Sequence, residues 1–301
     1  MSPSEEQFVD VGRGIELCYE TFGSPGDPPL LLVMALGMQL IAWPDDFCAL
    51  LAGEGFHVVR FDNRDAGLST SVKAPPPGLP QLATRRFGAG QYTLEDMADD
   101  AAGLLAALDL VPAHVVGASL GGMIAQTLAA RHPGSVRTLT SIMSTTGSRV
   151  KGQPQMGMLR ILLQRAPEGR DAFVEHFAKV FELIGSPDFP KDIEEMRDQA
   201  GRTYDRGVNP AGTGRQLAAI LKSGDRTKAL KAIVAPTLVI HGSKDRLVRP
   251  SGGKATAAAI PGAELMLIEG MGHDLPRAVW PRIVAAVAER GRRHDGALQT
   301  A

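Results

Sequence analysis

The chain has 301 residues, of which 44% are hydrophobic and 22% charged, and its formal net charge is −1. A charge this close to zero argues against a general nucleic-acid-binding protein, which carries a basic excess. Cys18 and Cys48 are too few for a disulfide framework and lie in no metal-binding spacing, so we expect a reducing, cytoplasmic compartment. The polar N-terminus (MSPSEEQ) lacks the features of a secretory signal, and no apolar run reaches the ~18 residues that span a membrane.

Short apolar runs, rich in β-branched residues, are typical of strands buried on both faces of a mostly parallel sheet. They are Leu30–Leu36, His57–Phe61, Ala113–Gly117, Val136–Met143, Pro236–Ile240 and Ala263–Ile268. Ahead of them, Phe8–Phe22 alternates around a Gly-Arg-Gly turn, which predicts an antiparallel hairpin at the sheet edge.

Helical patterns separate these runs. Thr93–Leu108 begins with an N-cap threonine and first-turn acids, a second helix follows Ser119, and a third covers Ala278–Arg290. The Pro-rich Ala74–Pro80 reads as a surface loop. The alternation of strands and helices predicts an α/β layered fold.

One segment interrupts this alternation. Residues 150–228 contain no convincing strand, but they do contain helical patterns at Met158–Arg165, Asp171–Ile184 and Ile193–Tyr204, punctuated by prolines. We interpret the segment as a helical cap domain over the ends of the strands. Residues 1–149 and 229–301 then form the core domain.

The motif Gly117-Ala118-Ser119-Leu120-Gly121 follows a predicted strand and opens a predicted helix. In that context G-x-S-x-G marks a nucleophile, whose strained backbone lifts its hydroxyl above the sheet. The helix N-terminus also favours an oxyanion nearby. The alternative is a glycine-rich turn with an incidental serine.

A serine nucleophile needs a base and an orienting carboxylate. Among seven histidines, His273 follows the last predicted strand, and His241, directly after the preceding strand, is its best rival. Asp245 follows that same strand by a short turn, whereas Asp274 is too close in sequence to accept from Nδ1 of His273. A loop histidine and a capping aspartate without catalytic roles are the alternatives.

The order Ser119, Asp245, His273 is that of the α/β-hydrolase-fold serine hydrolases, which the chain resembles over nearly its whole length. Leu30–Gly37 resembles the family's strand ending in an HGxG-type oxyanion loop, and Phe61–Ser69 resembles its DxRGxGxS-like turn. The Met-Ala-Leu-Gly loop, followed by Trp-Pro, looks most like bacterial carboxylesterases of the aclacinomycin methylesterase type.

The resemblance implies an α/β-hydrolase fold, two-step acyl transfer and no metal or organic cofactor. Met34 stands where many members have histidine and Ala35 where they have glycine, but the catalytic donor there is a backbone N–H. Counting from the strand assigns that donor to Leu36, and the second donor is the amide of Leu120. Both would stabilise the oxyanion.

The expected partner is a small-molecule ester, with no nucleic acid and no membrane, and the chain is expected to be a monomer or homodimer. The resemblance suggests small-alcohol esters of a bulky apolar acid. Candidate lining residues of an apolar cavity are Met38, Met143, Met156, Met158, Leu159 and Phe177. The alternative for each is that it packs the cap on the sheet.

Two hypotheses besides ester hydrolysis stay open on the sequence. The same triad performs C–C bond hydrolysis of diketone-like substrates and cofactor-free perhydrolysis, and G-x-S-x-G does not separate these from ester hydrolysis. A non-catalytic ligand-binding protein with the same pocket is the third hypothesis, against which the intact triad argues.

Overall fold

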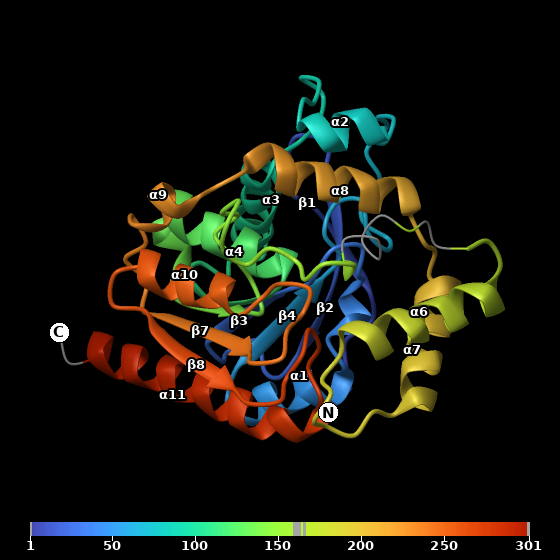
Figure 1. Ribbon diagram of the computed structural model, residues 1–301. Helices are drawn as coiled ribbons and strands as arrows, with labels where there is room; N and C mark the ends of the chain where they lie inside the picture. Colours follow the sequence, from blue (N-terminus) through green and yellow to red (C-terminus); the bar gives the residue numbers. More distant parts are fainter. Residues whose placement is uncertain (1, 159–163, 165–166, 300–301) are drawn as a thin grey trace.

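Eight strands form one sheet in the computed structural model, which describes residues 2–158, 164 and 167–299 (Figure 1). They are β1 (Gln7–Asp10), β2 (Glu16–Phe22), β3 (Pro29–Val33), β4 (His57–Phe61), β5 (Ala113–Ala118), β6 (Val136–Ile142), β7 (Thr237–Gly242) and β8 (Glu264–Ile268). Their order across the sheet is β1-β2-β4-β3-β5-β6-β7-β8. The β1–β2 and β2–β4 pairs are antiparallel and the remaining pairs parallel, which confirms the predicted hairpin and mostly parallel sheet.

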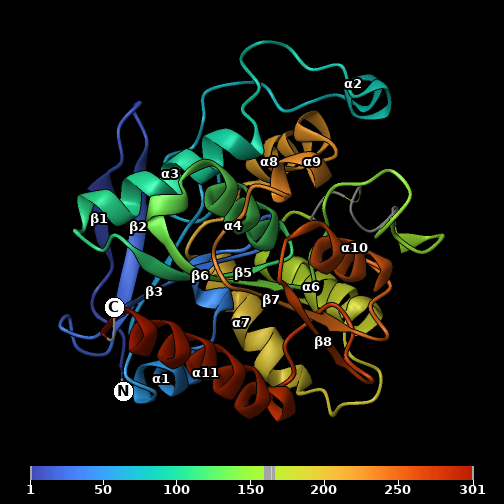
Figure 2. The same ribbon diagram turned by 90° about the vertical axis from the view of Figure 1, so that its left-hand side faces the viewer.

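Helices cover both faces of this sheet (Figure 2). The α-helices are α1 (Asp45–Gly53), α2 (Leu79–Thr84), α3 (Leu94–Ala107), α4 (Leu120–Arg131), α6 (Arg170–Ile184), α7 (Ile193–Asp205), α8 (Pro210–Ser223), α9 (Thr227–Leu230), α10 (Ser251–Ala259) and α11 (Trp280–Gln299), and the 3₁₀ helices are η1 (Leu40–Ala42), η2 (Pro133–Ser135) and η3 (Arg277–Val279). In Figure 2, α3, α4 and α10 lie on one side of the sheet and α1 and α11 on the other.

The two layers explain why the strand sequences are apolar on both faces. Successive side chains of a strand point to opposite sides. Leu31 and Val33 of β3 therefore pack into the cluster formed with α3 and α4, whereas Leu30 and Leu32 pack into the cluster formed with α1 and α11. Every residue of β4, β5 and β7 is buried. The sheet is thus fixed from both sides, and only the ends of its strands are open to a site.

The predicted helices other than that at 158–165 are present, α11 continues beyond its predicted end at Arg290, and further helices were not predicted. The α3 helix begins with the expected cap, because the Thr93 hydroxyl accepts from the Asp96 amide while the Asp96 carboxylate accepts from the Thr93 amide. By contrast, α8 and α10 contain glycines that read as loop in the sequence. The short helix α2 begins at Leu79, so the last two residues of the predicted loop are helical.

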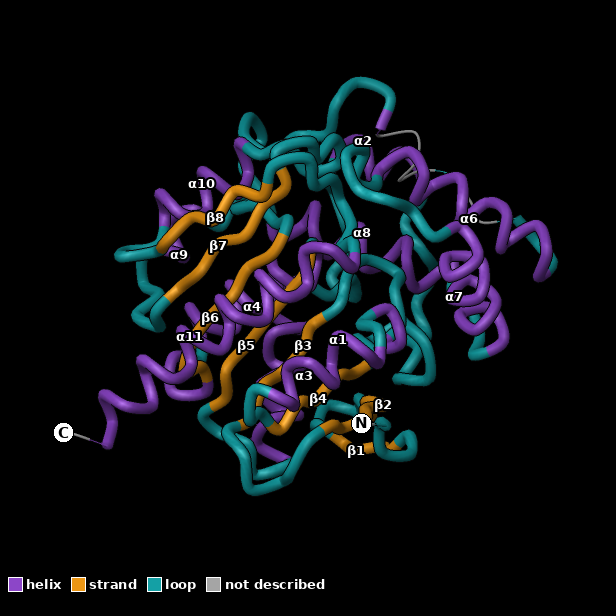
Figure 3. Tube along the Cα trace, turned by 90° about the horizontal axis from the view of Figure 1, so that it is seen from below, coloured by secondary structure: helices purple, strands orange, loops and turns teal. Residues whose placement is uncertain are grey.

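The segment from 150 to 228 lies between β6 and β7 and contains α6, α7, α8 and the start of α9, with no strand among its described residues. The predicted helix at 158–165 falls almost entirely outside the described residues. Figures 1 and 3 show α6 and α7 side by side, outside the helical layers that flank the sheet. Throughout the described ranges, no helix combines the length and apolar character needed to cross a membrane.

Candidate active site

Ser119 lies in the sharp turn between β5 and α4, with a φ of 54° and a ψ of −114°. A positive φ is rare for a residue other than glycine, so the expected backbone strain is present. The turn needs glycine at two positions. A Cβ on Gly117 would lie 2.2 Å from the carbonyl oxygen of Gly121, and one on Gly121 would lie 1.9 Å from that of Val33. Both glycines therefore allow strand and helix to approach closely, and Ser119 stays half-buried at the strand end.

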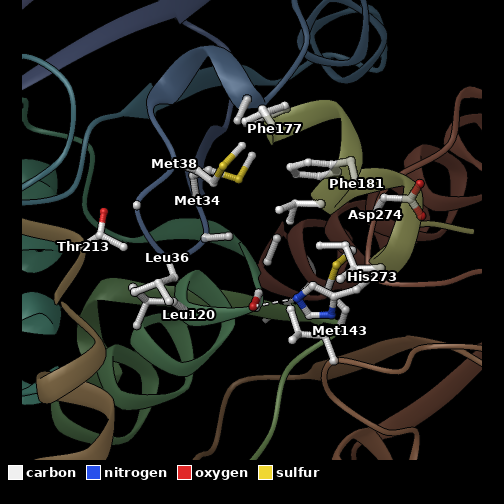
Figure 4. A pocket seen from close by; sticks show the side chains of 18 of the residues that line it. Met34, Leu36, Met38, Leu120, Met143, Phe177, Phe181, Thr213, His273 and Asp274 are labelled. Carbon is white, nitrogen blue, oxygen red and sulfur yellow. Dashed lines mark hydrogen bonds between the residues drawn. The ribbon is translucent and has the colours of Figure 1, made fainter. Parts of the chain in front are cut away.

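The structure brings the three predicted residues together. Nε2 of His273 lies 3.0 Å from Oγ of Ser119, as Figure 4 shows, and its Nδ1 lies 2.7 Å from Oδ2 of Asp245. A carboxylate only accepts, so Nδ1 carries the proton and Nε2 is free to accept from the serine hydroxyl. The Asp274 carboxylate instead accepts from the Ser186 amide and hydroxyl.

Asp245 is held by its own turn as well as by the histidine. Its Oδ1 accepts from the amides of Leu247 and Val248 at 2.9 and 2.8 Å. Burial on its own raises the pKa of this carboxyl, but the neighbouring His273 and hydrogen bonds from His241 and His273 outweigh it and lower the pKa to about 2. Asp245 is therefore ionised throughout the neutral range.

His241, the rival base, has a different role in the structure. Its ring is fully buried, and Nε2 donates to the carbonyl oxygen of Val248 at 2.7 Å and lies 3.4 Å from Oδ2 of Asp245. It makes no contact with Ser119 among the described hydrogen bonds. His241 thus stabilises the turn that carries Asp245.

The loop that carries His273 is held by the end of α6. The amide of His273 donates to the carbonyl oxygen of Ile184 at 2.8 Å, and the amide of Gly272 donates to the Ser186 hydroxyl at 2.8 Å. A residue of the 150–228 segment therefore helps to place the histidine. Sequence reasoning missed this link because neither Ile184 nor Ser186 belongs to a motif.

We call residues 34–38 the oxyanion loop and residues 62–69 the β4 loop. Leu36 of the oxyanion loop and Leu120, at the start of α4, both line the pocket beside Ser119 (Figure 4). Neither backbone amide donates a hydrogen bond to any described residue. The left-handed residue of the loop is Gly37, with a φ of 66°, and not Ala35. The alanine therefore introduces no backbone strain.

A cavity of about 1660 Å³ opens above Ser119 and His273. Met38, Met143 and Phe177 line it, as predicted, and Phe181 and residues of α2, α7 and α8 complete its largely apolar wall (Figure 4). Met156 lies only at its edge, because this side chain is almost fully exposed to solvent. The prediction for Met158 is wrong. This side chain is buried in a separate cluster with Ile184 and Leu247, so it packs between α6 and the loop after β7 instead of facing the cavity. Leu159 lies outside the described residues.

Two arginines of the 150–228 segment form ion pairs with the β4 loop. Arg206, next to α7, lies 3.0 Å from Oδ2 of Asp62, and Arg215 of α8 binds both carboxylate oxygens of Asp65 at 2.6 and 2.8 Å. Both carboxylates are fully buried. Sequence reasoning found the DNRDAG motif but not these partners, which lie about 140 to 150 residues away.

The described part of the chain contains no cluster of three or more histidine, cysteine or acidic side chains that would suit a metal ion. Burial raises the pKa of Cys18 and of Cys48 to about 12, so neither thiol is an activated nucleophile.

Known proteins are similar to this chain over most of its length. A family model described as the alpha/beta hydrolase fold matches residues 28–276. The chain is 29% identical over 310 residues to rhodomycin D methylesterase from Streptomyces sp. (strain C5). The alignment covers 92% of this chain and 95% of that protein.

Two solved structures share the fold. The enol-lactonase from Burkholderia xenovorans LB400 aligns with a TM-score of 0.73 at 23% identity, over 94% of this chain and 99% of that chain. The meta-cleavage product hydrolase from Pseudomonas fluorescens IP01 aligns with a TM-score of 0.75 at 17% identity, over 95% of this chain and 97% of that chain. At these identities the likeness concerns the fold alone.

Proposed function

Since the chain belongs to the α/β hydrolase family, we propose that it hydrolyses carboxylic esters with Ser119 as the nucleophile. The observation that carries the proposal is the hydrogen-bonded relay from Ser119 through His273 to Asp245, with distances of 3.0 and 2.7 Å, at the base of the cavity. The similarity to a methylesterase supports an ester as the substrate.

The mechanism follows from the positions of these groups. His273 removes the Ser119 proton as Oγ attacks the ester carbonyl, and Asp245 holds the imidazole and stabilises its cation. The amides of Leu36 and Leu120 donate to the oxyanion, and the loss of one such donor costs about 10² to 10³ in kcat. His273 then protonates the leaving alcohol, and water attacks the acyl-enzyme in the same way.

We infer that residues 150–228 form a cap that selects the substrate. They supply Phe177, Phe181 and other lining residues, and they hold the loop of His273 through Ile184. The cavity exceeds the roughly 300–1,000 Å³ of most small-molecule sites, and its wall is largely apolar. A small-alcohol ester of a bulky apolar acid fits these properties.

Hydrolysis of p-nitrophenyl esters from C2 to C12, and of methyl esters of large apolar acids, tests the proposal. We expect turnover that increases with the size of the acid and is absent in Ser119→Ala. Cleavage of a 2-hydroxy-6-oxo-dienoate without any ester turnover would replace the proposal with C–C hydrolysis. Tight binding of these esters with no turnover would replace it with a binding protein.

A further inference from the structure

We propose that Gln216, on helix α8, is a positioning residue that fixes the oxyanion loop through the amide of Gly37. The inference rests on the proposed function, because it assigns a role in stabilising the oxyanion. Gln216 lies outside the relay of Ser119, His273 and Asp245, and it does not line the cavity. It acts through the loop and not on the substrate.

The side-chain amide of Gln216 bridges two loops. Its Oε1 accepts from the backbone amide of Gly37 at 2.8 Å, and its Nε2 donates to the carbonyl oxygen of Arg64 at 2.8 Å. The side chain is fully buried. Its orientation is fixed, because a flipped amide would place donor against donor at Gly37 and acceptor against acceptor at Arg64.

The rest of the oxyanion loop has few restraints of its own. Nδ2 of Asn63 donates to the carbonyl oxygen of Met34 at 3.0 Å, and the amide of Met38 donates to the carbonyl oxygen of Ala35 at 3.2 Å. These bonds, with that of Gln216, are the hydrogen bonds that hold residues 34–38 in the described structure. Leu36 lies between the two anchored ends, and its amide remains free for an oxyanion.

Helix α8 is pressed directly against the glycine of this loop. A Cβ on Gly37 would lie 2.6 Å from Oγ1 of Thr213, one turn before Gln216. Arg215, which directly precedes Gln216, binds Asp65 of the β4 loop at 2.6 and 2.8 Å. The same stretch of α8 therefore contacts both loops, and these contacts limit the movement of the Gln216 backbone relative to Gly37.

The amides of Leu36 and Gly37 belong to consecutive peptide units that meet at the Cα of Leu36. Loss of the bond to Gly37 would free this Cα to shift, and the Leu36 amide attached to it would shift as well. Loss of the Gln216 bond should therefore weaken the interaction that develops in the transition state more than the binding of the ester itself. That difference separates a positioning role from a merely structural one.

The test replaces Gln216 with methionine, which keeps the length of the side chain and removes both hydrogen bonds. With p-nitrophenyl esters as the probe, we expect kcat of Gln216→Met to fall about 10- to 100-fold while KM changes less than about threefold. The inhibition constant of a trifluoromethyl ketone, which forms an oxyanion on the serine, should rise in parallel with the fall in kcat. The matched control is Gln126→Met, because Gln126 is equally buried and bonds to Ser141 and Arg226, away from the oxyanion loop.

Gln216→Glu keeps an acceptor for Gly37 and, when ionised, loses the donor to Arg64, so it should retain more activity than the methionine variant. If Gln216→Met does not fold, a kcat of Gln216→Glu below that of Gln126→Met would overturn the inference, because the acceptor for Gly37 is still present. Unchanged kcat in folded Gln216→Met, or an equal fall of kcat in Gln126→Met, would also overturn it, while wild-type activity leaves the proposed function intact. A wild type that neither hydrolyses esters nor reacts with a serine-directed phosphonate would overturn both.

Discussion

Oγ of Ser119 lies 3.0 Å from Nε2 of His273, although 154 positions separate the two residues in the chain. Their strands, β5 and β8, are three places apart in the sheet, a separation of about 14 Å between strand axes. The loop after β8 must therefore turn back across the ends of β7 and β6. Its bonds to Ile184 and Ser186 hold it in that position.

Ser119→Ala removes the nucleophile without disturbing the turn. We expect kcat/KM for p-nitrophenyl esters to fall by about 10⁵- to 10⁶-fold, because the members of such a relay act as a unit. Steady-state hydrolysis measures the change. Ser141→Ala is the control, since Ser141 is buried in the neighbouring strand β6 and bonds to Gln126. Residual activity of even 1% in a purified Ser119→Ala protein would contradict the assignment of the nucleophile.

Asp245→Asn should disable the base while leaving the fold intact. The two amides of Leu247 and Val248 would hold the oxygen of the new side chain, so its NH₂ group would face Nδ1 of His273. The ring would then carry its proton on Nε2 and could not accept one from the serine. We expect kcat to fall about 10⁴-fold at neutral pH. A loss of less than tenfold would show that Asp245 does not fix the tautomer.

The same carboxylate predicts a pH dependence of stability. Its pKa is about 2 in the fold, below the value of about 3.9 in an unfolded chain. The folded state therefore favours the ionised form, and this stabilisation is complete above about pH 5 and is lost as the pH falls towards 2. Between those limits, the free energy of unfolding should fall by about 2 kcal/mol more in the wild type than in Asp245→Asn. Parallel urea-unfolding results at both pH values would contradict the low pKa.

Much of this site could be predicted from the sequence because local constraints determine it. The turn around Ser119 needs small residues at Gly117 and Gly121, and a parallel sheet places the loops that carry Asp245 and His273 at the same edge. The ties between distant segments have no such local signature. Gln216 and Arg215 lie in a stretch whose glycines predict a loop, and they look like ordinary polar residues until α8 is placed on the loops that they bind. Met158 likewise reads as a lining residue, because composition does not show which way it points.

Gly121→Ala tests the close approach of strand and helix. The new Cβ would lie 1.9 Å from the backbone oxygen of Val33, which no rotation of a side chain can relieve. We expect the free energy of unfolding to fall by about 2–3 kcal/mol or more. Gly134→Ala is the control, because nothing lies within 4 Å of its added Cβ. Equal midpoints in urea for the two variants would mean that the turn tolerates the methyl group.

Arg215→Met tests the tie between α8 and the β4 loop. The Asp65 carboxylate has no solvent exposure and would keep the hydroxyl of Tyr92 and the amide of Val72, each at 2.8 Å, but no positive partner. An unpaired buried charge costs about 3–5 kcal/mol, so the variant should unfold at much lower urea concentration. Adding Asp65→Asn should recover part of this loss, since it removes the charge. Arg170→Met, at a solvent-exposed pair with Asp205, should be indistinguishable from the wild type.

Phe181→Trp tests whether the acid part of the ester occupies one arm of the cavity, which we define as the part lined by Phe177 and Phe181 of α6. Phe181 stacks on Phe177 with 4.6 Å between ring centroids, and both rings lie in the part of the pocket near Met34 and Met38 in Figure 4. A larger ring there should lower kcat/KM for C10 and C12 esters at least about tenfold and leave the C2 ester within about threefold, since only long chains reach the arm. Leu183→Trp is the control, because that side chain is half exposed on α6 and does not line the cavity. A uniform loss across the series would indicate a disturbed relay, and no loss at any length would place the acid in another arm.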